Sequence, residues 1–153
     1  MTIYDYKAGK QRIETILENN MKVIEQNKLP GDDELTFTNG YHCWVSAIFV
    51  DMRDSTELCA FENKEKLAKI FRSFSSEVIE ILRNDDNLRE IGIRGDCVYA
   101  IYTTPYQYNV YEIADKCFYI NTFMKMFNKL LTKYSLPQIK VGIGMSTDKE
   151  LVV

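Results

Sequence analysis

The sequence predicts an α+β fold in which helices pack on an antiparallel-containing sheet, with a further helix at the N-terminus. Apolar residues recur at helical spacing in three segments, and short runs rich in β-branched and aromatic residues lie between them. A strand, a crossover helix, a hairpin, a second helix and a final strand follow one another, which is the ferredoxin-like order. The chain has 153 residues, enough for one such domain.

Composition excludes several classes of protein. Hydrophobic residues make up 46% and charged residues 27%, which is typical of a globular domain and not of a disordered or coiled-coil chain. A net charge of −3 argues against a general binder of nucleic acid or anionic membranes. No apolar run approaches the roughly 20 residues of a membrane span, and the first ten residues are polar and charged. We therefore expect a cytoplasmic protein with no membrane or nucleic-acid partner.

The cysteine and histidine content argues against two kinds of site. Four cysteines lie at 43, 59, 97 and 117, and no two of them form a C-x-x-C pair. His42 is the single histidine. A structural zinc site and a nucleophile–histidine triad are therefore not expected. Each cysteine lies in an apolar or helical context, which predicts buried, reduced thiols.

The N-terminal segment reads as a helical arm. Its apolar residues have the spacing of one helix face and predict a helix over 8–27; they are Ile13, Ile16, Leu17, Met21 and Ile24. Pro30 and Gly31 then interrupt the helix, and the stretch up to Gly40 reads as a linker. We therefore expect an arm over 1–28 and one domain over 29–153.

The remaining elements follow from periodicity and turn residues. Strands are predicted over 44–50, 88–94, 97–102 and 139–145, and helices over 54–83 and 108–134. Asp54, with Glu57 three residues later, is expected to cap the first of these helices. Gly95 and Asp96 predict a tight hairpin turn.

Two carboxylates stand out in this arrangement. Asp51 ends the first core strand and Asp96 lies in the hairpin turn, so both are expected at neighbouring strand ends. Paired carboxylates suit Mg²⁺ or Mn²⁺ together with substrate phosphates. The helix start at Asp54, Ser55 and Thr56 would favour phosphate. Each aspartate alone would also suit a cap or a turn, but together they point to phosphoryl or nucleotidyl transfer.

Three strings resemble the class III nucleotide cyclases. They are Phe49 to Leu58, Ile93 to Ala100 and Ile139 to Met145, which are similar to the family's strand-to-helix segment, its Gly-Asp hairpin and its next strand. The resemblance covers roughly residues 43–147, and its three motifs occur in the family's order. It implies a ferredoxin-like cyclase fold.

The resemblance also implies a mechanism and a site. Asp51 and Asp96 match the family's catalytic aspartates, which hold two Mg²⁺ or Mn²⁺ ions per site, and Met52 matches the residue whose backbone carbonyl helps to hold one ion. Asp54 and Ser55 replace the family's usual Gly-Phe beside the phosphates, and Thr56 matches its Thr. The implied reaction is attack of the ribose 3′-oxygen on the α-phosphorus, with pyrophosphate leaving.

The base-binding positions depart from those of adenylate cyclases. Gly92 stands where these enzymes carry the Lys that reads adenine. Arg94 lies nearby and is a candidate contact to base or phosphate, or a surface charge. Phe49 shares a strand face with Asp51, and either fills the space that a purine would occupy or packs in the core.

A closer resemblance is to the pyrimidine cyclases of the Pycsar antiphage system. It rests on residues 29–30, 39–41, 49–56 and 147–153. It implies production of cyclic UMP or cyclic CMP from UTP or CTP by a homodimer whose site lies at the interface. The cyclic nucleotide then activates a separate effector protein.

Other readings stay open at this point. Class III cyclases continue past the strand at 139–145 with an Asn and an Arg that act on the transition state, so the C-terminal part is expected to be missing here. The alternatives are a purine (adenylate or guanylate) cyclase, a non-catalytic nucleotide-binding or dimerisation module of the same fold, and an interaction domain in which both aspartates are caps.

Overall fold

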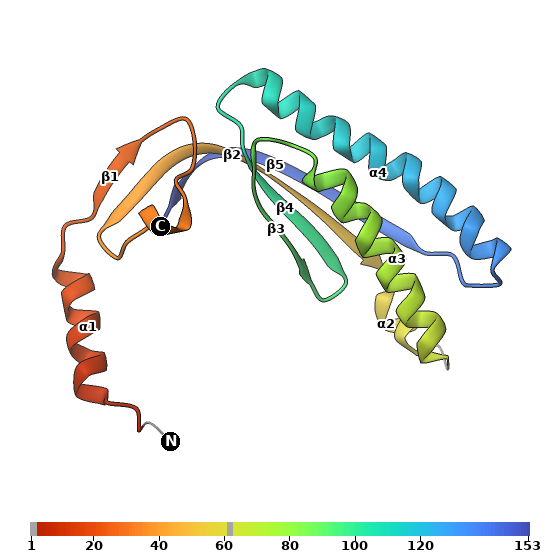
Figure 1. Ribbon diagram of the computed structural model, residues 1–153, viewed down its shortest axis with the longest axis horizontal. Coiled ribbons are helices and arrows are strands. Elements are labelled where there is room, and N and C mark those ends of the chain that lie inside the picture. The colour runs from red at the N-terminus through yellow and green to blue at the C-terminus, as the bar shows by residue number, and fades with distance from the viewer. Residues whose placement is uncertain (1–2, 61–62) are drawn as a thin grey trace.

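A computed structural model describes residues 3–60 and 63–153. In chain order its elements are α1 (Tyr6–Glu18), β1 (Lys22–Glu25), the 3₁₀ helix η1 (Asp32–Glu34), β2 (Asn39–Arg53), α2 (Ser55–Cys59), α3 (Lys64–Arg83), β3 (Leu88–Arg94), β4 (Cys97–Thr103), α4 (Gln107–Lys133) and β5 (Lys140–Val152) (Figure 1). From β2 onward, the order of long elements is the predicted ferredoxin-like one, and this prediction is confirmed.

Strand β2 is the centre of the sheet. Along one edge, β5 pairs antiparallel with it, from Tyr41 opposite Val152 to Arg53 opposite Lys140. Along its other edge, β4 pairs antiparallel over 45–51 and β1 pairs parallel over 39–42. Strand β3 continues the sheet beyond β4. Strands β1, β4 and β5 therefore pair directly with β2, and β3 joins the sheet through β4.

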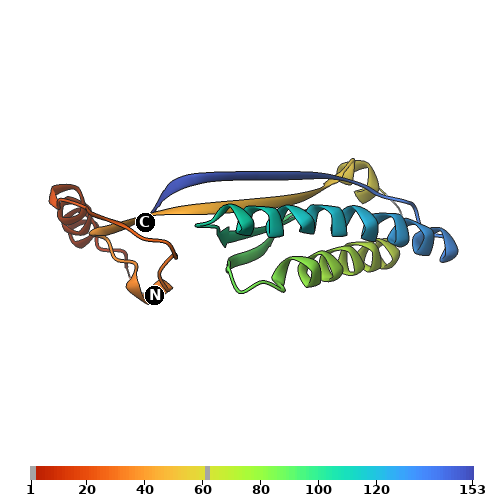
Figure 2. The same cartoon turned by 90° about the horizontal axis from the view of Figure 1, so that it is seen from above.

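The two long helices cover one face of the sheet. Figure 2 shows α3 and α4 side by side beneath the strands. Ile48, Val50 and Met52 of β2 are buried in the core that these helices close. Because strand side chains alternate between faces, Phe49 and Asp51 point to the opposite face. No described helix covers this open face.

The N-terminal prediction is wrong in its second half. Helix α1 ends at Glu18, and Lys22–Glu25 forms strand β1 where a helix over 8–27 was expected. Backbone pairing explains the change: the Lys22 N–H donates to the Thr38 carbonyl, and Val23 and Ile24 lie beside β2. These β-branched residues favour a strand once a neighbouring strand is available.

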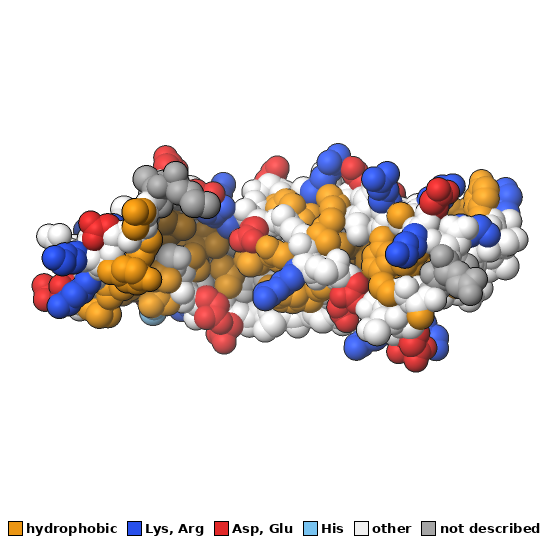
Figure 3. All heavy atoms as spheres, turned by 90° about the horizontal axis from the view of Figure 1, so that it is seen from below, with side chains coloured by type: hydrophobic (Ala, Val, Ile, Leu, Met, Phe, Trp, Pro, Cys, Tyr) orange, Lys and Arg blue, Asp and Glu red, His pale blue; other side chains and the backbone are white. Residues whose placement is uncertain are grey.

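The arm lies at the far end of the molecule from α2 (Figure 1). Its side chains at Tyr6, Ile13 and Leu17 are exposed, and apolar atoms gather around a hollow at this end in Figure 3. A cavity of about 560 Å³ lies between α1 and the segment 36–38. Within the described residues, no helix has the length and hydropathy of a membrane span.

The helix after β2 also differs from its prediction. Asp54 has a positive φ of 56° and its side chain makes no capping hydrogen bond, so the expected cap with Glu57 is wrong. Helix α2 spans five residues, and α3 begins separately at Lys64. The true cap of the long helix is Asn63, whose side chain accepts a hydrogen bond from the Lys66 N–H at 3.0 Å. Residues 61–62, within the predicted helix over 54–83, lie outside the described part.

The cysteine prediction holds only in part. All four thiols are free, as expected, but only Cys43 is buried. Cys97 and Cys117 are half-buried, and Cys59 is exposed on α2. The short α2 explains the exposure of Cys59, because it contributes no buried residue to the core.

Tyr102 provides a test of the packing between sheet and helices. Its ring is fully buried, and its hydroxyl donates a 2.7 Å hydrogen bond to the Leu82 carbonyl near the end of α3. Tyr102→Phe leaves this carbonyl unpaired and should lower the free energy of unfolding by about 1–2 kcal/mol. Urea denaturation measures the change. Tyr119→Phe, at an exposed position on α4, is the matched control, and equal stabilities for the two variants would contradict the prediction.

Candidate active site

Asp51 and Asp96 lie at the same end of the sheet. Asp51 pairs with Cys97, the first residue of β4, and Asp96 immediately precedes Cys97 in the hairpin turn. The Met52 N–H also donates to the Asp96 carbonyl at 3.4 Å. Gly95 makes the tight turn with φ of 65°, a backbone conformation that glycine adopts without strain. The structure therefore brings together the two aspartates that the sequence singled out.

The charges of both carboxylates affect the pKa of the Cys97 thiol. Burial raises the pKa of this thiol first, and the negative charges of Asp51 and Asp96 raise it further. The thiol is therefore protonated at neutral pH and is not a nucleophile here. Asp51 and Asp96 come from two chain segments, and both lie close enough to this thiol to act on it.

The donor set fits a hard divalent cation. The two carboxylates and the Met52 carbonyl offer oxygen atoms, the type of donor that Mg²⁺ and Mn²⁺ prefer. Among the described residues, no group of three or more His, Cys, Asp or Glu side chains is placed to hold a metal. Magnesium usually takes one or two protein carboxylates and completes its shell with water and substrate phosphates. The site therefore suits a metal–nucleotide complex better than a metal held by protein alone.

Two glycines of β5 lie on the open face beside β2. Gly142 lies opposite Asp51, and Gly144 lies opposite Phe49 on the same face. A Cβ atom at Gly144 would meet nothing within 4 Å, whereas one at Gly142 would collide with the Arg53 guanidinium. The β5 side of the open face is thus flat at Gly144 and filled by a cationic side chain at Gly142.

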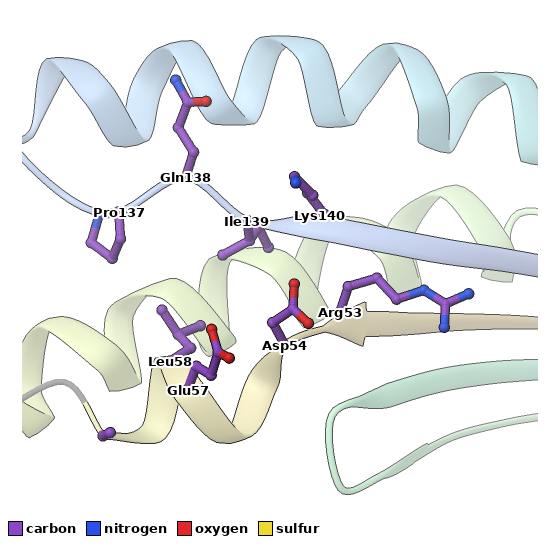
Figure 4. Close-up of a pocket in the computed structure, with 9 residues that line it drawn as sticks. Arg53, Asp54, Glu57, Leu58, Pro137, Gln138, Ile139 and Lys140 are labelled. Carbon is purple, nitrogen blue, oxygen red and sulfur yellow. The ribbon is translucent and has the colours of Figure 1, made fainter.

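Of the three residues predicted to contact phosphate at the start of α2, only Asp54 lines a cavity. Asp54 lines a cavity of about 450 Å³ between α2 and residues 137–140, where its carboxylate points toward Ile139 (Figure 4). Ser55 and Thr56 are not among the residues that line this cavity. Because α2 has only five residues, its dipole is small. Phosphate contacts from Asp54, Ser55 and Thr56 stay a prediction.

Phe49 and Arg94 both lie on the open face near the aspartates. The Phe49 side chain is 49% exposed, so its alternative role in core packing is wrong. Its ring stacks on Tyr99, with centroids 6.0 Å apart. Arg94 is exposed and pairs with Cys97 across the hairpin. The structure thus groups Phe49 and Arg94 with Asp51 and Asp96.

Sequence reasoning missed two residues of this surface, Arg53 and Tyr99. Strand alternation from Asp51 would have placed Arg53 on the open face. Tyr99 is opposite Phe49 only because of the β2–β4 register, which the sequence does not display. The position of Tyr99 could therefore not be found without the sheet.

His42 lies far along β2 from Asp51 and takes no part in this site. Its Nδ1 atom is 3.2 Å from a Glu25 carboxylate oxygen, and Lys149 contacts the other oxygen at 2.6 Å. The Lys149 contact is the main reason that the pKa of Glu25 is lowered. These residues fasten β1 to β2 and β5.

Comparison with known proteins agrees with this architecture. The chain matches no protein-family model. A crystal structure of a class III adenylyl cyclase-like ATP-binding protein from Pseudomonas aeruginosa matches 98% of the chain and 34% of its own length, with a TM-score of 0.67 and 15% identity. The guanylyl cyclase Cya2 matches 73% of the chain and 57% of its own length, with a TM-score of 0.64 and 16% identity.

The chain therefore carries a domain of the class III nucleotide cyclase fold. Two curated proteins, both named uridylate cyclase, resemble this cyclase domain in sequence. One, from Treponema porcinum, is 57% identical over 98% of the chain, and one from Gulbenkiania mobilis is 30% identical over 98%. The chain spans 52% and 61% of their respective lengths. The resemblance inferred from the three sequence motifs is confirmed.

The carboxylate pair generates a metal-binding prediction. Asp51→Asn and Asp96→Asn each remove a charged ligand, so each should weaken Mn²⁺ binding in the presence of a nucleoside triphosphate by about tenfold or more. Electron paramagnetic resonance of free Mn²⁺ measures the binding. Asp86→Asn, in the exposed turn before β3, is the control and should bind as the native chain does. Unchanged Mn²⁺ binding in both site variants would contradict the placement of the metal site.

Proposed function

We propose that this cyclase domain belongs to a uridylate cyclase that converts UTP to cyclic UMP and pyrophosphate. The observation that carries the proposal is 57% identity over nearly the whole chain to a protein of that name, with Asp51 and Asp96 side by side on the open face. UTP is preferred over CTP in this proposal because both curated relatives bear the name uridylate cyclase.

The proposed reaction is an in-line displacement. A bond forms between the ribose 3′-oxygen and the α-phosphorus, the bond from that phosphorus to pyrophosphate breaks, and the 3′-hydroxyl proton passes to solvent. Asp51, Asp96 and the Met52 carbonyl would hold two Mg²⁺ or Mn²⁺ ions, which when bound neutralise the triphosphate and lower the pKa of the 3′-hydroxyl.

The other side chains of the open face bind and orient the nucleotide in this proposal. Arg53 and Arg94 flank the carboxylates and supply positive charge for the phosphates. Ser55 and Thr56 contribute hydroxyl and backbone donors at the end of β2. Phe49 contacts the sugar or base. Such groups act by positioning the reacting atoms and stabilising developing charge.

Assembly and biological role extend the proposal. The carboxylates lie on a sheet face that no described helix covers. We propose that a second copy faces this surface and completes the site in a homodimer. The cyclic nucleotide then serves as a messenger to a separate effector protein in antiphage defence, as the resemblance to the Pycsar cyclases implies.

A nucleotide-binding module without turnover is the second candidate. One observation favours it: a solved structure that matches 98% of the chain is described as an adenylyl cyclase-like ATP-binding protein. The two candidates share the site and differ in whether pyrophosphate is released.

Turnover with the four nucleoside triphosphates tests the proposed function. The chain, and the longest native form that carries it, are incubated with Mn²⁺ and UTP, CTP, ATP or GTP, and the products are separated by chromatography. Cyclic UMP is expected as the main product. Cyclic AMP or GMP would overturn the pyrimidine assignment. Nucleotide binding without any cyclic product would favour the second candidate.

Aspartate variants test the catalytic assignment. Asp51→Asn and Asp96→Asn should each lower kcat by about 100-fold or more, because the charge that organises the reacting phosphates is lost. Circular dichroism should show an unchanged fold, since both side chains lie at the surface end of the sheet. Near-native turnover in either variant would contradict its assigned role, and Asp86→Asn again serves as the control.

A further inference from the structure

We propose that the outer side of helix α4 is an interface at which two copies of this chain pair, with their α4 helices antiparallel. This outer side is a strip of exposed residues that runs along the helix away from its buried side; it consists of Tyr108, Tyr111, Asp115, Phe118, Thr122, Met126, Lys129 and Lys133. The inference does not rest on the proposed function, because α4 covers the sheet face opposite the open face (Figure 2).

Helix α4 carries large apolar side chains on more than its buried side. Ile113, Ile120 and Phe127 pack into the core. On the outer side, however, Tyr111 is 61% exposed and Phe118 is 67% exposed, so no described element covers these rings. A helix with apolar side chains around its whole circumference is usually buried on all sides. The outer side of α4 is therefore suited to contact with another molecule.

The spacing of the outer residues is the same in both directions from Thr122. Toward the N-terminus, the next three members of the strip follow at steps of four, three and four residues. Toward the C-terminus, the steps are again four, three and four residues. Such steps keep side chains on one stripe of a helix, as in coiled coils. An antiparallel pair with its two-fold axis at Thr122 therefore lays the strip of one helix onto that of the other.

The charges of the strip are complementary in this arrangement. Asp115 and Lys129 lie equally far from Thr122 on its two sides, so the two-fold axis sets the aspartate of each copy opposite the lysine of the other. A parallel pair would instead set like charges opposite each other. Antiparallel pairing also brings the positive N-terminal end of each helix dipole beside the negative C-terminal end of the other. The charges therefore favour a second copy in antiparallel orientation.

The apolar residues near the axis also match. Phe118 and Met126 are equally far from Thr122, so each ring would meet a thioether, which is a favourable contact. Thr122 itself is small enough for the helices to approach closely at the axis. Its hydroxyl already donates a 3.0 Å hydrogen bond to the Phe118 carbonyl, so covering it leaves no unpaired donor.

Charge reversal tests the pairing. Asp115→Lys and Lys129→Asp each set like charges opposite each other, so each should weaken self-association by about tenfold or more. The double variant Asp115→Lys/Lys129→Asp reverses both charges and should restore the native association. Within one helix these two positions are about 21 Å apart, at 1.5 Å per residue. Restoration can therefore come only from contact between two chains.

Sedimentation velocity of the chain, and of the longest native form that carries it, measures self-association over a range of concentrations. Phe118→Glu places a charge among the apolar residues near the axis and should abolish the contact. Asp86→Lys, in the exposed turn before β3, is the matched control for charge reversal and should associate as the native chain does. Circular dichroism should show a native fold in every variant, because all the substituted positions are exposed.

Three results would overturn the inference. One is a native chain that stays monomeric up to about 0.1 mM, where a contact of micromolar Kd would be nearly saturated. Another is self-association that neither the charge reversals nor Phe118→Glu weakens, which would assign it to a different surface, such as the open face. The third is a loss in the single variants that the double variant does not restore.

The result is independent of the proposed function, because association requires no turnover. If the homodimer at the open face also forms, the native chain assembles beyond a dimer, and Phe118→Glu stops at the dimer. If that homodimer does not form, Phe118→Glu is a monomer. A chain without cyclase activity that still shows the charge-swap restoration would overturn the proposed function and support this interface.

Discussion

The alternation of side chains along β2 is the constraint on which the rest of the structure depends. Ile48, Val50 and Met52 are buried beneath α3 and α4, so the residues between them must face the other way. A slip of one residue in register would turn Asp51 into the core and bury a carboxylate among apolar side chains. The strand that anchors the fold therefore also fixes which face carries the charge.

The same strand explains how a site is assembled from distant segments. Pairing with β4 brings Asp96 and Tyr99 beside β2, and pairing with β5 brings Gly142 and Gly144 to its other edge. Strand β4 thus adds the Tyr99 ring, the hairpin turn adds the second carboxylate, and β5 leaves open space at Gly144. The short helix α2 adds less, because its few residues cannot build a strong dipole.

Local sequence patterns predicted the hairpin and the long helix α4 well, since their causes are local. Gly95 specifies its own turn, and the apolar period of α4 spans many turns of one helix. The failures have non-local causes: β1 forms because β2 lies beside it, and Tyr99 joins the site through register alone. Asp51 and Asp96 could be found because the sequence alone predicts Asp51 near a strand end and Asp96 in a tight turn.

Diffraction from crystals grown with Mn²⁺ and a non-hydrolysable UTP analogue tests the central claim most directly. The open face of β2 and the β3–β4 hairpin should hold a metal–nucleotide complex. Anomalous density for Mn²⁺ is expected in contact with Asp51 and Asp96, with the nucleotide on the open face beside them. Manganese and nucleotide bound elsewhere, such as the cavity between α2 and residues 137–140, would contradict it.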